Sequence, residues 1–118
     1  MQQSIAFVMR PADHHAAGAL REHSERRLFF ALRRFQHRIR RVTVRIVDLN
    51  GPKRGVDSRC AITLDLVDGH RVIAEAVTPW PFASVTRAAG RLNRAVRDLA
   101  PRRQRRRPGF VGVAEHQA

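Results

Sequence analysis

The chain is poor in several residue types, and each shortage excludes a class of protein. It has 118 residues with one cysteine, one lysine, no tyrosine and only 10 aspartates and glutamates. The lone Cys60 cannot form an internal disulfide or a thiolate metal cluster, and we expect it to be buried and inert. No apolar run approaches the roughly 18 residues that span a bilayer, and residues 1–9 lack the pattern of a signal peptide. We therefore expect a cytoplasmic protein that does not bind a membrane.

Motifs that carry catalytic chemistry are also missing. The turn residues 50–55 are not followed by a helix, so they cannot form a phosphate-binding loop. The acidic residues are scattered over expected surface positions and supply no pair of carboxylates for acid–base catalysis. His14 and His15 would point about 100° apart on a helix, and no third ligand lies at a supporting spacing. The sequence predicts no enzyme activity, no cofactor, no metal site and no small-molecule substrate.

Arginine is the residue that the chain has in excess. Lysine and arginine together number 23, which leaves a net charge of +13 and a calculated pI near 11.9, and only Lys53 is a lysine. The planar guanidinium suits bidentate contacts with phosphate and stacking on bases better than an ammonium does. Nucleic acid is therefore the first partner to consider.

The hydrophobic pattern predicts four strands and two helices. Strands are expected over 4–9, 41–48, 59–66 and 71–77, and helices over 14–36, capped by Asp13, and 82–99, with Pro81 in the first turn. Four strands with one polar face need their apolar face covered by both helices. The fold class is thus α+β, a two-layer β-α-β-β-β-α domain with a four-stranded sheet and two helices packed on one face. Residues 1–100 are expected to form this RNA-binding domain and residues 101–118 a mobile basic tail.

Two details of this pattern concern which side chains face inward. Positions three and four apart in the first helix predict a buried stripe of Leu20, Ser24, Leu28, Ala31, Leu32 and Phe35. In the last strand, either Val72, Ala74 and Ala76 or Ile73 and Val77 can face the core, and we favour the first register.

The helix over 82–99 is the strongest candidate for an RNA contact, because it has an apolar side and an arginine side. Arg87, Arg91, Arg94 and Arg97 recur three or four residues apart, with only Asp98 nearby. A surface helix that pairs its own charges would alternate their signs. The pattern predicts that this row meets an anionic surface.

Further RNA-binding candidates lie outside that helix. They are Arg26, Arg33, Arg34, Arg41, Arg45, Arg59, Arg102 and Arg103. Glu22 and Glu25 could pair with the arginines of the first helix instead, and basic residues on an exposed sheet face also serve solubility. Lys53 and Arg54 at a loop tip could reach a groove. The tail that contains Arg102 and Arg103 is expected to add affinity without setting the binding site.

Each of three aromatic residues has two possible roles. Phe29 and Phe30 point partly away from the buried stripe, so they either pack at the sheet edge, which we favour, or stack on a base. Trp80 stands between two prolines and is expected to cover the junction of helix and sheet, with base stacking as the alternative.

Several segments, in this order along residues 4–107, are similar to the ribosome hibernation promoting factor family of small bacterial proteins. They are Ala-Leu-Arg-Glu at 19–22, Arg-Ile at 38–39, Val-Thr-Val-Arg at 42–45, Asp-Leu-Asn-Gly-Pro at 48–52, Gly-Val-Asp at 55–57 with Cys60, and Phe-Ala-Ser-Val at 82–85. Arg91 and Arg94 match positions of the second helix that are usually basic in the family. The sequence departs from the family at Trp80, where an aspartate commonly caps the helix, and Thr78 could supply that cap instead.

The resemblance implies a function and a partner. Basic helix faces would bind rRNA of the small ribosomal subunit near the decoding region, and the folded body would block mRNA and tRNA sterically during hibernation under stress. It also implies a short-form member, without the C-terminal dimerisation domain of the long form, and we expect a monomer off the ribosome. The sequence leaves two alternatives, a general module for structured RNA and a basic interaction protein with an acidic protein partner.

Overall fold

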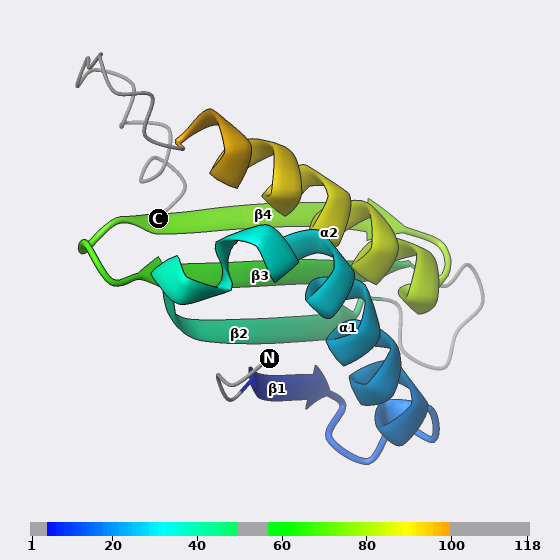
Figure 1. Ribbon diagram of the computed structural model, residues 1–118. Helices are drawn as coiled ribbons and strands as arrows, with labels where there is room; N and C mark the ends of the chain where they lie inside the picture. Colours follow the sequence, from blue (N-terminus) through cyan, green and yellow to red (C-terminus); the bar gives the residue numbers. More distant parts are fainter. Residues whose placement is uncertain (1–4, 50–56, 100–118) are drawn as a thin grey trace.

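The computed structural model describes residues 5–49 and 57–99, which form two layers (Figure 1). The elements in chain order are β1 (Ile5–Arg10), α1 (Ala17–Leu32), a 3₁₀ helix η1 (Arg33–Arg38), β2 (Ile39–Asp48), β3 (Ser58–Leu66), β4 (Arg71–Thr78) and α2 (Pro81–Asp98). Figure 1 shows both α-helices on the same side of the four-stranded sheet. The predicted α+β class and the β-α-β-β-β-α order are confirmed.

The sheet has the strand order β1-β2-β3-β4, with β1 parallel to β2 and the other pairs antiparallel. The register places Val44 beside Ile62 and Ile62 beside Ala74, so alternate residues of each strand share one face. Ala74 and its neighbours two positions away are buried, which confirms the favoured register of β4. Gly69, with φ +96°, forms the turn between β3 and β4 in the left-handed backbone region that glycine tolerates.

The first helix differs from its prediction at both ends. The α-helix stops at Leu32, and the chain continues as η1 to Arg38. The prediction of an Asp13 cap was wrong, because turn residues separate Asp13 from the helix and Ala16 is the N-cap. The side chain of His14 meets this end instead, since its Nδ1 accepts the backbone N–H of Ala16 at 3.0 Å. The predicted stripe is confirmed, with Leu20, Ser24, Leu28 and Leu32 buried and Ala31 and Phe35 partly buried against the core.

The second helix begins at Pro81, as predicted, and Trp80 is its N-cap residue. Thr78 was a candidate cap, but no side chain caps this helix. The Thr78 hydroxyl instead donates to the Trp80 carbonyl at 2.6 Å, which stabilises the turn that leads into α2. The core-facing side of α2 contains Val85, Ala88, Ala89, Leu92 and Val96, all buried.

The core lies between the helices and the sheet and includes Cys60, which is fully buried as predicted. Burial raises the pKa of the Cys60 thiol to about 12, so the thiol stays protonated and unreactive at neutral pH. Neither α-helix in the described part of the chain is long and apolar enough to cross a membrane.

Candidate nucleic-acid interface

The four predicted arginines of α2 are on the surface of the helical layer. Arg87, Arg91, Arg94 and Arg97 are exposed, while the residues between them pack on β3 and β4. Across residues 5–49 and 57–99, none of the recorded ion pairs involves any of the four. Packing of the apolar side thus holds a row of unneutralised guanidinium groups on a rigid element.

Arg91 has a structural partner that the other three lack in the described chain. Its Nη1 donates to the backbone carbonyl of Glu75 at 2.7 Å, on the outer strand β4. A carbonyl that points outward from an edge strand has no neighbouring strand to pair with, so this bond satisfies it. Arg91 therefore contributes to the joint between α2 and the sheet edge, and its remaining N–H groups can meet a ligand.

The predicted arginines at the other helix are Arg26 on α1 and Arg33 and Arg34 in η1, and all three are exposed. The sequence left open whether these arginines pair with Glu22 or Glu25 or bind RNA. In the structure Glu25 pairs with Arg21 instead, at 3.4 Å, and both side chains are about half exposed. Such a pair contributes little to stability.

Sequence reasoning missed Arg27, an exposed residue of α1 whose charge acts on His23. Its spacing was the available clue, because it lies seven residues before Arg34 and therefore on the same side of the helix predicted over 14–36.

The arginines predicted on the strands lie on the opposite side of the molecule. Arg41, Arg45 and Arg59 alternate with buried residues that face the helices, so they project from the open face of the sheet. Arg41 is in register with Asp65, which also forms an ion pair with Arg71 at 2.7 Å. The structure therefore does not bring all the predicted arginines together, and one segment of RNA on the helices would leave the strand arginines on the far side.

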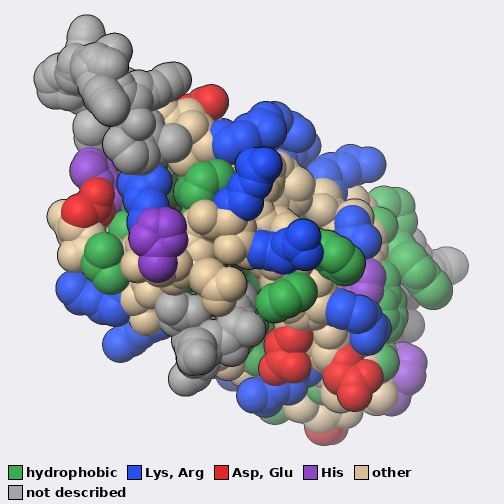
Figure 2. Space-filling model, viewed as in Figure 1, with side chains coloured by type: hydrophobic (Ala, Val, Ile, Leu, Met, Phe, Trp, Pro, Cys, Tyr) green, Lys and Arg blue, Asp and Glu red, His purple; other side chains and the backbone are tan. Residues whose placement is uncertain are grey.

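We use the name helix surface for the exposed residues of α1, η1 and α2 on the face opposite the sheet. Figure 2 shows Lys and Arg side chains along α2, and acidic ones gathered mainly over the N-terminal half of α1. The predicted arginines on the helix surface are Arg26, Arg33, Arg34, Arg87, Arg91, Arg94 and Arg97. Its positive charge is concentrated over α2 and the end of α1.

The exposed aromatic residues correct two expectations. Phe30 is 64% exposed and does not pack at the sheet edge, whereas Phe29 is 40% exposed, so its ring is partly covered. Trp80 is 64% exposed and does not cover the junction of helix and sheet. For the two phenylalanines the reason is geometric, because α1 packs through its leucine stripe and their rings lie off that stripe.

A small polar contact joins the two helices beneath the helix surface. His23 Nε2 lies 3.1 Å from Thr86 Oγ1, and the His23 ring meets the Phe82 ring edge-on at 5.2 Å. Burial lowers the pKa of His23, and the charges of Arg27 and Arg26 lower it further, against a backbone hydrogen bond with Phe82 that raises it. The neutral ring is therefore favoured in this contact.

Some predictions fall on residues outside the described ranges. They concern Lys53, Arg54, Arg102, Arg103 and the tail over 101–118. Within the described residues, no group of three histidine, cysteine, aspartate or glutamate side chains is placed to hold a metal ion.

The fold and its charge define a small α+β protein with an arginine-rich helical layer. A scan of protein families matches residues 13–104 to the sigma 54 modulation protein / S30EA ribosomal protein family, whereas a search of curated proteins finds no match. The match spans most of the chain, so the protein belongs to this family. It is a family of ribosome-associated factors and not of enzymes.

Solved structures support the fold. The N-terminal domain of Protein Y from Thermus thermophilus is 23% identical, with a TM-score of 0.64, over 84% of this chain and 99% of that one. A ribosomal subunit interface protein from Coxiella burnetii is 16% identical, with a TM-score of 0.63, over 80% of this chain and 94% of that one.

Proposed function

We propose that the protein inhibits translation by binding the small ribosomal subunit through its helix surface, near the decoding region. Family membership supports association with the ribosome. The observation that carries the finer proposal is the row of Arg87, Arg94 and Arg97, exposed and without a recorded ion pair among the described residues. Each guanidinium group can form two hydrogen bonds with one phosphate, and a row of such groups on a helix can contact several phosphates of an RNA.

The proposed mechanism is steric and needs no bond to be made or broken. The arginines of the helix surface neutralise phosphates of rRNA and set the orientation of the protein on the subunit. The packed sheet behind them forms a stiff body that occupies the space needed by mRNA and tRNA. One copy per subunit is sufficient for this action, and the cytoplasm is where we expect it to take place.

The helix surface is preferred over the open sheet face for a physical reason. On the sheet face, Arg41 and Arg71 lie around Asp65, which offsets part of their charge. On α2 the only acidic residue is Asp98, in its last turn. A polyanion is therefore attracted more strongly to the α2 part of the helix surface.

Co-sedimentation with separated ribosomal subunits tests the proposal. Arg87→Glu/Arg94→Glu reverses two charges on the helix surface, and Arg45→Glu/Arg59→Glu makes the same change on the sheet face. We expect stoichiometric binding of the wild type to small subunits alone, a loss of more than about tenfold in affinity for the helix variant, and a smaller loss for the sheet variant. Arg91 is left intact because it also bonds to β4.

Three outcomes would contradict the proposal. Equal losses from the two double variants would mean that charge alone, and not the helix surface, directs binding. Equal binding to large and small subunits, or to a plain RNA duplex, would reduce the protein to a general RNA-binding module. As a control, both variants must have the thermal unfolding curve of the wild type, which shows that a loss of binding does not come from a loss of folding.

A further inference from the structure

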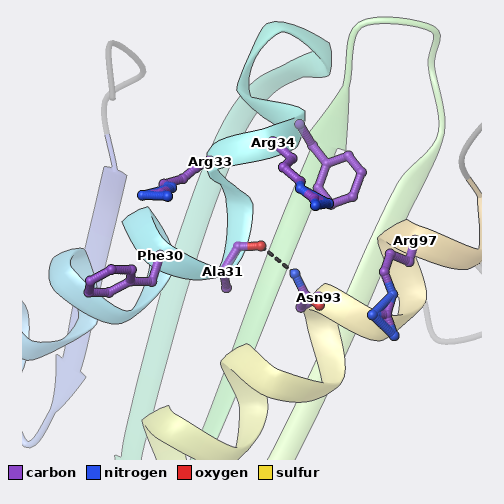
Figure 3. Close-up of a pocket in the computed structure, with 7 residues that line it drawn as sticks. Phe30, Ala31, Arg33, Arg34, Asn93 and Arg97 are labelled. Carbon is purple, nitrogen blue, oxygen red and sulfur yellow. Dashed lines mark hydrogen bonds between the residues drawn. The ribbon is translucent and has the colours of Figure 1, made fainter.

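A cleft opens between the C-terminal end of the first helix and the C-terminal half of α2. It measures about 300 Å³, which is at the small end of the usual range for ligand pockets, roughly 300–1,000 Å³. Residues of η1, which follows the end of the α-helix at Leu32, line the cleft together with residues of α2. Figure 3 shows the side chains that line it.

A hydrogen bond between the helices forms the centre of the cleft. The Nδ2 of Asn93 donates to the backbone carbonyl of Ala31 (Figure 3). This bond holds α2 against the last turn of α1 and positions the Asn93 amide in the cleft. Since the bond uses one amide N–H, the amide oxygen and the second N–H can still meet polar edges of a ligand.

The walls of the cleft include two aromatic rings of different burial. Phe35 packs partly against the core, whereas Phe30 is 64% exposed. The guanidinium carbon of Arg33 lies 5.8 Å from the centre of the Phe30 ring, within the range of a cation–π contact. An exposed ring beside guanidinium groups is the usual platform on which proteins stack unpaired bases.

The charge of the cleft is positive. Arg33, Arg34 and Arg97 line it, all three are exposed, and no carboxylate is among the lining residues. In Figure 3, Arg33 lies with Phe30 on one side of the Asn93 bond, and Arg34 and Arg97 lie on the other. Three like charges around one cleft repel one another, so a bound anion would stabilise the arrangement.

We propose that this cleft binds one unstacked nucleotide of a single-stranded RNA segment, its base on Phe30 and its phosphate on the surrounding arginines. The inference deepens the proposed function and rests on it for the identity of the RNA as rRNA. A free nucleoside 5′-phosphate offers the same chemistry, so the experiment compares the two sources.

The test uses the full-length protein and three probes. They are a fluorescent RNA strand of about 12 nucleotides without secondary structure, the duplex that it forms with its complement, and adenosine 5′-monophosphate. Phe30→Leu removes the stacking ring from the cleft, and Phe29→Leu is the matched control, on the neighbouring exposed ring outside the cleft. Arg33→Gln removes a cleft charge, with Arg10→Gln on β1 as its control.

The single strand is expected to bind more tightly than the duplex and to shift the NMR signals of the Asn93 side-chain amide. Phe30→Leu should weaken single-strand binding about tenfold, and Phe29→Leu less than about twofold, because stacking on one aromatic ring contributes at this level. Arg33→Gln should weaken binding more than Arg10→Gln does.

Equal effects of the two phenylalanine variants, or a duplex that binds as well as the single strand, would overturn the proposal. If the mononucleotide binds as tightly as the strand and its binding depends on Phe30 in the same way, the ligand of the cleft is a free nucleotide and not RNA. Sedimentation of the same variants with small subunits separates the two hypotheses. If small-subunit binding is retained and strand binding does not depend on Phe30, the cleft proposal fails while the proposed function stands.

Discussion

At the residue scale, His23 couples stability to pH. Thr86 donates its hydroxyl proton to the Phe82 carbonyl at 3.2 Å, so its oxygen is left to accept the Nε2–H of His23. Because the pKa of His23 is lowered in the folded state, the unfolded chain binds the extra proton first as the pH falls through about 6.5. The free energy of unfolding should therefore decrease as the pH falls below that value and be at its full value above it.

Urea unfolding at about pH 7.5 and about pH 5.5 measures this effect, because the interval brackets the unperturbed histidine pKa. His23→Gln should reduce the loss of stability between the two pH values. His37→Gln, at an exposed position in η1, is the control and should leave the loss as in the wild type. A His23→Gln variant with the wild-type dependence on pH would contradict the assignment.

At the element scale, Gly90 weakens α2 without a visible packing reason. It is in the middle of the helix, and a Cβ added there would meet no atom within 4 Å. Gly90→Ala should raise the free energy of unfolding by about 0.5–1 kcal/mol, because alanine loses less backbone entropy on forming a helix.

Chemical denaturation of Gly90→Ala is best compared with Gly69→Ala. Gly69 also has open space for a Cβ, but its φ of +96° strains any residue with a side chain. The two substitutions add the same methyl group and should change stability in opposite directions. The same sign for both would show that the backbone argument does not apply to this protein.

At the scale of the whole molecule, a net charge of +13 makes binding to a polyanion depend on salt. If the protein neutralises about six to ten phosphates, its affinity for small subunits should fall by about 10³–10⁵ between about 50 and about 200 mM salt. Arg87→Glu/Arg94→Glu should lower the slope of log affinity against log salt by at least about two, since each arginine contributes about one contact.

Titration of small subunits at several salt concentrations gives these slopes. The sheet-face variant Arg45→Glu/Arg59→Glu is the comparison, and its slope should change less. A fall of less than about tenfold over the same interval would contradict phosphate neutralisation as the source of affinity.

Much of the fold could be predicted because it follows from local patterns. Alternation in β2, β3 and β4 identified the residues that now face the core, and the turn at Gly69 agreed with the register. The Asp13 cap failed because a cap depends on where the helical turn begins, which His14 and its neighbours decide. The predicted packing of Phe30 and Trp80 was wrong because hydrophobicity does not tell how far a neighbouring element extends.

The sequence by itself determined the excess of arginine, the two faces of α2 and the alternation of the strands, because charge and periodicity are properties of the chain. The tertiary structure agrees with the predicted placement of Arg87 on the helical layer and of Arg45 on the open face of the sheet. It alone placed Arg33 and Asn93 around one cleft and Arg91 on the carbonyl of Glu75. These relations join residues far apart in the chain, and they exist only after the helices have packed on the sheet and buried their common apolar surface.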